Sequence, residues 1–214
     1  MKNIISFIVL ICSVAVITVS CAKKDEESTT AATTSKTTTT PSGSITMGSY
    51  TASGVYLSSC FYGSSVSTLI SAGSFPSDAQ SFGFAFVVTG DDSFTQETHV
   101  FTDTGCTTSS YIGKAVSDNV TVGTASGANY PVTYNDQGVK LTVNTTTAKT
   151  WLETRYANAG LSLDMTVGTE KAIAPASTTL TYGLWTPGAT TIYLATESTD
   201  STPSTAGAIV YTKE

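Results

Sequence analysis

The chain has 214 residues, of which 40% are hydrophobic and 12% charged, and its formal net charge is −6. This length and apolar content are sufficient for one domain with a sizeable core. Residues 45–214 are more acidic still, with six Lys and Arg against thirteen Asp and Glu. Because a nucleic-acid-binding surface needs clustered cations, the composition argues against nucleic acid as a partner.

The N-terminal segment has the pattern of an export signal. Lys2 supplies a positive charge, residues 4–17 are almost wholly apolar, and Thr18, Val19 and Ser20 precede Cys21. The apolar run is shorter than the ~20 residues that a membrane-spanning helix needs. We therefore predict a cleaved signal peptide over residues 1–20, the alternative being an uncleaved membrane anchor.

A cysteine directly after such a segment resembles a bacterial lipobox, with Thr18 where Leu is usual, in a relaxed form similar to that of spirochaetes. The resemblance implies that Cys21 is the first residue of the mature protein and is acylated on its sulfur and its amine. No Asp follows Cys21, and this absence implies sorting to the outer membrane. The expected location is lipid-anchored to the outer membrane, on its periplasmic or its surface face.

The segment after Cys21 is too polar to form a core. Residues 28–44 contain twelve Ser and Thr and no aromatic residue. Such a composition cannot bury enough surface to offset the entropy of ordering. We predict a lipidated cysteine and disordered tether over residues 21–47 and a folded domain over residues 48–214.

From about residue 48 the apolar residues recur with a period of two, which is typical of strands. In "SFGFAFVVTG", Phe82, Phe84 and Phe86 alternate with small residues, and "TGDDS" then provides a turn before "SFTQETHVFTD". These two segments predict a hairpin. Further strands are predicted at 110–116, 118–124, 138–144, 161–168, 179–185, 190–197 and 207–213, with a turn at "YNDQG" (134–138). The fold class is therefore all-β, an antiparallel barrel of about eight or more strands, with a β-sandwich as the alternative.

One segment has helical spacing. Trp151, Leu152, Arg155 and Tyr156 fall three and four residues apart, which predicts a short helix near residues 148–158. Thr147 is a candidate for its N-cap, and Gly160 for its end.

Two cysteines remain in the predicted domain, Cys60 and Cys106. In an exported chain they most simply form a disulfide. Two free buried thiols are the alternative, and a zinc site is less favoured because metal-binding cysteines usually come in closely spaced pairs.

The order of "SSC" (58–60), an aromatic-rich hairpin, "FTDTGCT" (101–107) and the closing "TLTYGLWTPGATTIYL" resembles a group of small bacterial outer-membrane lipoproteins with a lipocalin-like barrel. The resemblance covers most of residues 50–213. It implies pairing of Cys60 with Cys106 and a lipocalin-like fold. It implies no particular activity.

His99 is the only histidine, and strand alternation predicts that Glu97, His99 and Asp103 share one face. Such a set could bind a metal ion or act as a general base. A solvated polar patch on the barrel wall is the favoured interpretation, and we expect no metal site, no cofactor and no enzymatic activity.

Three functions follow from these expectations. The preferred one is a membrane-anchored binding or interaction module, with a protein or a small apolar ligand as its partner. The second is a lipocalin-like carrier of an apolar ligand inside the barrel. An enzyme or metal site around His99 comes last.

Overall fold

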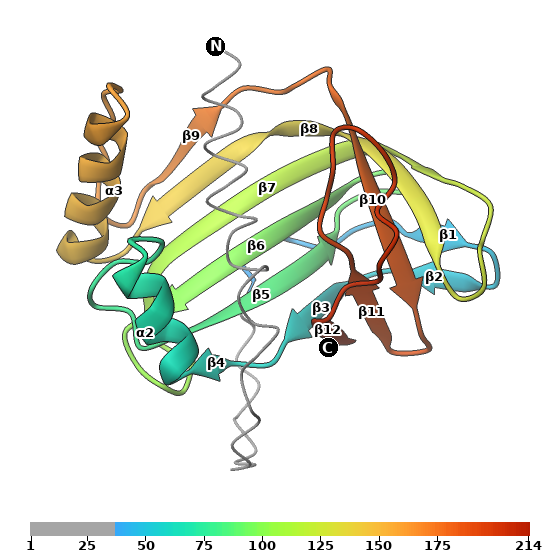
Figure 1. Ribbon diagram of the computed structural model, residues 1–214, viewed down its shortest axis with the longest axis horizontal. Helices are drawn as coiled ribbons and strands as arrows, with labels where there is room; N and C mark the ends of the chain where they lie inside the picture. The colour runs from blue at the N-terminus through green and yellow to red at the C-terminus, as the bar shows by residue number, and fades with distance from the viewer. Residues whose placement is uncertain (1–36) are drawn as a thin grey trace.

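The structure, a computed structural model, describes residues 37–214. The predicted signal peptide, Cys21 and the first part of the predicted tether lie outside the described residues. The described chain forms a closed antiparallel barrel, which confirms the predicted all-β barrel class (Figure 1). Its eight strands are β3 (Val55–Ser58), β5 (Ser81–Val88), β6 (Phe94–Phe101), β7 (Ser109–Val122), β8 (Tyr130–Val143), β10 (Leu180–Pro187), β11 (Thr191–Leu194) and β12 (Val210–Lys213).

The β5–β6 hairpin forms as its alternating pattern predicts. Its register runs from Ser81 opposite Phe101 to Val88 opposite Phe94. Phe82, Phe84 and Phe86 belong to the main core cluster inside the barrel, whereas the intervening Ala85 and Val87 form a separate small cluster. The period of two thus sets which face of β5 is internal.

Strand β8 closes the barrel through its first half. Residues 130–135 pair with β10, from Tyr130 opposite Trp185 to Asn135 opposite Leu180. The predicted turn at residues 134–138 is wrong, because these residues lie within the strand. Gly138 has a φ of 107°, and a register shift at Val139/Lys140 follows it, so the strand bends here without ending.

The two strands predicted at 110–116 and 118–124 are one continuous strand, β7. The register with β8 shifts around residues 118–121, where Asn119 adopts a φ of 54°. Asn tolerates this left-handed conformation better than most residues, so an irregularity is accommodated within a continuous strand.

Four short strands lie outside the barrel. β4 (Phe61–Tyr62) pairs with β5, and β9 (Glu170–Ala174) pairs with the second half of β8. β1 (Ile45–Met47) and β2 (Tyr50–Ala52) form their own small sheet. The strand predicted at 161–168 is absent from the described fold, since extended pairing begins at Glu170.

Folded structure also begins before the predicted boundary at residue 48. The Ser42 N–H donates to the Val88 carbonyl at 3.0 Å, and the Ser44 N–H donates to Asp91 Oδ1 at 3.0 Å. Residues 37–44 therefore run along the barrel instead of forming part of a free tether.

Two helices, α2 (Ser64–Ser71) and α3 (Thr146–Asn158), lie at the same end of the barrel (Figure 1). Helix α3 confirms the predicted helix but begins earlier, because Thr145, not Thr147, caps it by accepting the Ala148 N–H at 3.0 Å. Gly160, with a φ of 73°, follows its end as predicted. Sequence patterning did not predict α2.

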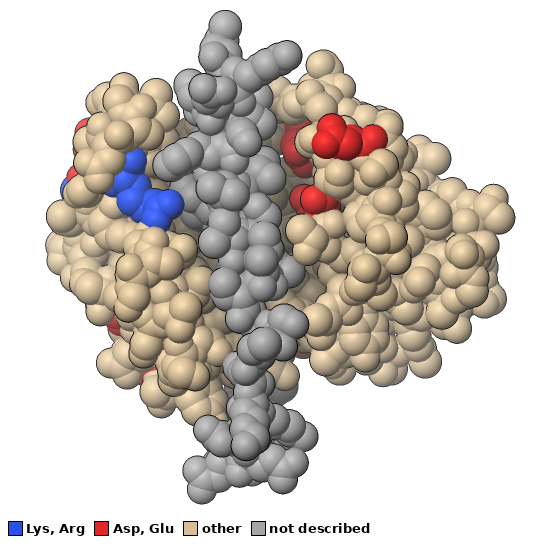
Figure 2. Space-filling model, in the orientation of Figure 1, with Lys and Arg blue, Asp and Glu red and all other residues tan. Residues whose placement is uncertain are grey.

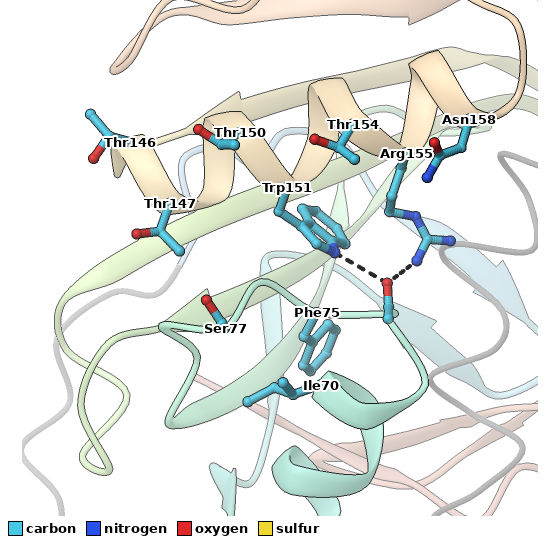
Figure 3. A pocket seen from close by; sticks show the side chains of 11 residues that line it. Ile70, Phe75, Ser77, Thr146, Thr147, Thr150, Trp151, Thr154, Arg155 and Asn158 are labelled. Atoms are coloured by element: carbon cyan, nitrogen blue, oxygen red, sulfur yellow. Dashed lines mark hydrogen bonds between the residues drawn. The ribbon is translucent and has the colours of Figure 1, made fainter.

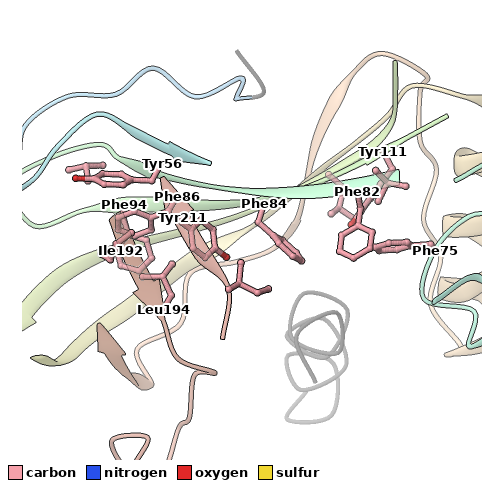
Figure 4. Packing of buried hydrophobic residues seen from close by; sticks show 14 of the residues in the cluster. Tyr56, Phe75, Phe82, Phe84, Phe86, Phe94, Tyr111, Ile192, Leu194 and Tyr211 are labelled. Atoms are coloured by element: carbon pink, nitrogen blue, oxygen red, sulfur yellow. The ribbon is translucent and has the colours of Figure 1, made fainter. Parts of the chain in front are cut away.

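Aromatic side chains line the inner face of the sheet, with a group at each end and Phe84 between them (Figure 4). At one end, Phe94 packs against Phe86, Trp185 and Tyr134, with ring centroids 4.9–5.2 Å apart. At the other end, Phe82 packs against Phe75 and Phe61, with centroids 5.0–5.1 Å apart. These contacts are in the range of favourable aromatic pairs.

A disulfide joins Cys60 to Cys106 across a sequence separation of 46 residues. Cys60 lies between β3 and β4, and Cys106 lies in the connection between β6 and β7. The bond therefore links the start of the barrel to its central hairpin.

Candidate functional site

An open cleft of about 770 Å³ separates α3 from the chain segment that follows α2 (Figure 3). We call it the α3 cleft. Its volume falls within the range of typical small-ligand sites. It is lined by Ile70, Gly73, Phe75, Ser77, Thr146, Thr147, Thr150, Trp151, Thr154, Arg155 and Asn158.

Helical spacing explains which side chains of α3 reach the cleft. Residues 146, 150, 154 and 158 form one row at intervals of four, and residues 147, 151 and 155 form the adjacent row. The opposite side of the helix buries Ala148, Leu152 and Tyr156. The buried residues hold α3 on the barrel, so the exposed row (146, 150, 154 and 158) and the half-buried row (147, 151 and 155) face the cleft.

Trp151 and Arg155 are held in place by one carbonyl group. The Trp151 indole Nε1–H donates to the Gly73 carbonyl at 3.1 Å, and Arg155 Nη1 donates to the same oxygen (Figure 3). The Arg155 guanidinium lies 5.5 Å from the centroid of the Trp151 ring, and the edge of Tyr111 packs against that ring at 5.5 Å. These contacts restrict both side chains before any ligand arrives.

The cleft has one charged lining residue, Arg155, and no carboxylate. Burial lowers the pKa of the Arg155 guanidinium, partly opposed by Tyr111 nearby. Arg155 Nε is buried without a hydrogen-bond partner in the described part of the chain. The nearest acid on α3, Glu153, instead pairs with Lys149 and accepts the Met165 N–H at 2.8 Å.

Figure 2 shows Lys and Arg atoms beside α3 and a group of Asp and Glu atoms over β10 and the loop after β11, with further acidic atoms at the α3 edge of the view. The acids near α3 include Glu153 and Asp164, which both lie within ion-pair distance of Lys149.

Two of the three residues predicted as a polar patch, Glu97 and His99, lie together. His99 Nε2 is 2.6 Å from Glu97 Oε2, and both side chains are buried. The strands pair Glu97 with Ala85 and Lys114 on the face opposite the main core. Thr39 donates its hydroxyl to the Glu97 carboxylate, and the Thr38 N–H lies 3.4 Å from it.

These contacts determine the charge state of Glu97. Burial alone would raise its pKa, but hydrogen bonds from His99 and Thr39 and the charge of Lys114 outweigh that effect and leave the pKa lowered. The pair therefore fastens residues 38–39 to the outer wall of the barrel.

Asp103 does not join this pair, because β6 ends at Phe101 and the chain turns away. Its carboxylate accepts the backbone N–H groups of Gly105, Thr107 and Thr108. Burial alone would raise the pKa of Asp103, but the combined hydrogen bonds from Thr108 and Thr107 outweigh it and lower the pKa to about 2. Asp103 thus shapes the loop that carries Cys106.

Sequence reasoning missed a group of acids at the barrel interior. Burial raises the pKa of Glu197, and the nearby Asp136 raises it further. The Asp136 pKa is also raised by burial, although Thr181 donates to its carboxylate at 3.3 Å. Glu197 keeps some solvent-accessible surface, and it comes from the loop between β11 and β12.

The α3 cleft was also missed, although Trp151 and Arg155 stood out as part of the helical pattern. The signal available was a row of exposed Thr and Asn at intervals of four beside them. Within residues 37–214, no group of three or more His, Cys, Asp or Glu could hold a metal ion. Nor does any described helix have the length and apolarity to cross a membrane.

No protein-family model matches this chain, and no curated protein matches it. Function must therefore be inferred from the geometry and chemistry of the site.

Proposed function

We propose that the protein is a lipid-anchored binding module of the bacterial outer membrane and that it holds its ligand in the α3 cleft. The proposed anchor is Cys21, and the Ser/Thr-rich segment after it gives the barrel reach from the membrane. The barrel serves as a rigid support and performs no catalysis.

The observation that carries the proposal is the fixed geometry of the cleft. Trp151 and Arg155 share the Gly73 carbonyl as acceptor, and Leu152 and Tyr156 pack α3 onto the barrel. A site formed before binding loses less entropy when the ligand arrives. An aromatic ring and a cation held in this way are typical of binding residues.

The position of the Glu97–His99 pair supports binding over catalysis. The pair is buried on the outer barrel wall and bonded to Thr39, and neither residue lines the α3 cleft. A general base must lie within hydrogen-bonding distance of the substrate proton that it removes. Neither Glu97 nor His99 lines the α3 cleft, so neither is placed to act on a ligand bound there.

A carrier of an apolar ligand inside the barrel has less support. Phe86, Phe94 and Trp185 pack against one another with ring centroids 5.2–5.3 Å apart, and each is at most 1% exposed. Close ring packing of this kind fills the interior at that end of the barrel.

Native mass spectrometry of the protein purified from its own membrane tests the proposal. We expect diacyl or triacyl mass on Cys21 and a retained small molecule. The variant Thr150→Arg, which places a large side chain in the cleft, should lose the molecule. Ala157→Arg, an exposed change on α3 outside the cleft lining, should retain it. Unmodified Cys21, or a molecule retained equally by both variants, would contradict the proposal.

A further inference from the structure

We infer that the ligand of the α3 cleft is an acidic saccharide whose carboxylate pairs with Arg155. This inference deepens the proposed function and depends on it.

Charge indicates an anion. Arg155 is half-buried, and none of the salt bridges in the described part of the chain involves it. Nη1 is already used by the Gly73 carbonyl, whereas Nε has no partner. An incompletely paired cation loses hydration without full compensation. Because Nε is buried, a ligand carboxylate would reach the guanidinium from its terminal nitrogens, where it would form a charge-assisted hydrogen bond.

The number of cations favours a carboxylate over a more highly charged group. Arg155 is the one charged residue among those that line the cleft. Lys149, the other cation in this helix, bonds to Glu153 and to the Met165 carbonyl. One guanidinium matches one planar, singly charged carboxylate in charge and in geometry.

The remaining polar lining is neutral and rich in hydroxyl groups. Six of the lining residues carry a hydroxyl or a carboxamide, and Figure 3 shows them along the helix and opposite it. They are Ser77, Thr146, Thr147, Thr150, Thr154 and Asn158. Such groups both donate and accept hydrogen bonds, as a ligand with many hydroxyl groups requires.

The indole of Trp151 supplies an apolar surface among these polar groups. The side chain is partly exposed, and its Nε1–H is already bonded to Gly73. Phe75 and Ile70 lie across the cleft from it (Figure 3). The C–H face of a sugar ring packs on such a surface while its hydroxyls reach the threonines, and an apolar lipid would leave those hydroxyls unpaired.

The length of the site indicates more than one sugar unit. Helix α3 has 13 residues, so the lined face extends about 20 Å. The lining rows run from its first turn to its last residue, which suits a linear oligosaccharide along the helix.

Calorimetric titration with trigalacturonate and with its methyl ester tests the inference, since esterification removes the carboxylate charges and keeps the sugar chain. We expect the acid to bind at least about tenfold more tightly than the ester, as loss of a charge-assisted hydrogen bond implies. Arg155→Gln should remove the difference, and Arg155→Lys should restore part of it. Lys140→Gln, which removes a charge outside the cleft lining, should leave the difference unchanged. Thermal melting of each variant establishes that it is folded.

Equal binding of acid and ester, or an unchanged preference in Arg155→Gln, would overturn the assignment of the carboxylate. Absence of binding by either probe would overturn the assignment of this saccharide class. The proposed function would survive both results if Thr150→Arg still released the molecule retained from the membrane. It would fail separately if Thr150→Arg and Ala157→Arg behaved alike there.

Discussion

Removal of the Cys60–Cys106 disulfide should strongly destabilise the barrel. The bond closes a loop with a sequence separation of 46 residues. Loop-closure entropy predicts that its removal lowers the free energy of unfolding by about 4 kcal/mol, because the unfolded chain gains freedom. The perturbation is the double variant Cys60→Ala, Cys106→Ala in the mature chain with Cys21→Ala, and the assay is urea denaturation followed by tryptophan fluorescence.

The single variant Cys60→Ala in the same background is the matched control. It opens the loop but leaves the buried Cys106 side chain beside Ser81. We expect it to lose nearly as much stability as the double variant, since loop opening dominates. A loss below about 1 kcal/mol in both variants would refute the loop-entropy reasoning. A large loss in the double variant alone would instead assign the effect to packing at Cys106.

Glu197→Gln should stabilise the protein at pH 8 and have little effect near pH 4, as measured by thermal melting. The pKa of Glu197 in the folded state is raised. The protonated carboxyl therefore contributes to folding stability below the unfolded-state pKa, and this stability is lost as the pH rises through the folded-state pKa. Thr39→Val should lower the free energy of unfolding by about 2 kcal/mol in urea, because it removes a hydrogen bond to the charged Glu97. Gly207→Ala should lower the melting temperature, since a Cβ there would overlap the backbone carbonyl of Leu194.

Each of these three predictions has a clear contrary result. A pH-independent effect of Glu197→Gln would mean that the carboxyl is ordinarily solvated. A Thr39→Val variant as stable as the parent would show that the hydrogen bond from Thr39 to Glu97 does not stabilise the barrel. For the glycine, Gly123→Ala is the matched control, because a Cβ there meets its neighbours at 3.4 Å or more. Equal melting of the two alanine variants would contradict the steric argument.

Local pattern was sufficient for the parts of the fold that depend on neighbouring residues. The β5–β6 hairpin follows from the alternation of phenylalanines with small residues, and the turn between them is short. Helix α3 follows from the spacing of Trp151, Leu152, Arg155 and Tyr156. In both cases the periodic face is also the buried or cleft-lining face, so pattern and structure agree.

Long-range pairing decided the parts that pattern could not predict. Residues 134–138 have the composition of a turn, but pairing with β10 and with β7 keeps them within strand β8. Residues 161–168 alternate like a strand, yet Glu170–Ala174, which is more polar, pairs with β8 instead. Tertiary contacts override local preference at such places.

The candidate site was unpredictable for the same reason. The α3 cleft forms between residues 70–77 and residues 146–158, which are far apart in the chain. Trp151 and Arg155 gave a helical signal, but only the folded chain brings the Gly73 carbonyl to both of them. Similarly, alternation along β6 predicted the proximity of Glu97 and His99, but it did not predict that Thr39 covers the pair.

The most direct test of the central claim uses the two tryptophans of the chain as position markers. Trp151 lines the α3 cleft, whereas Trp185 is 1% exposed inside the barrel. In a ¹⁵N-labelled sample titrated with trigalacturonate, the account predicts that the indole N–H signal of Trp151 shifts and that of Trp185 does not. A shift of the Trp185 signal with Trp151 unchanged would place the ligand inside the barrel and contradict the account.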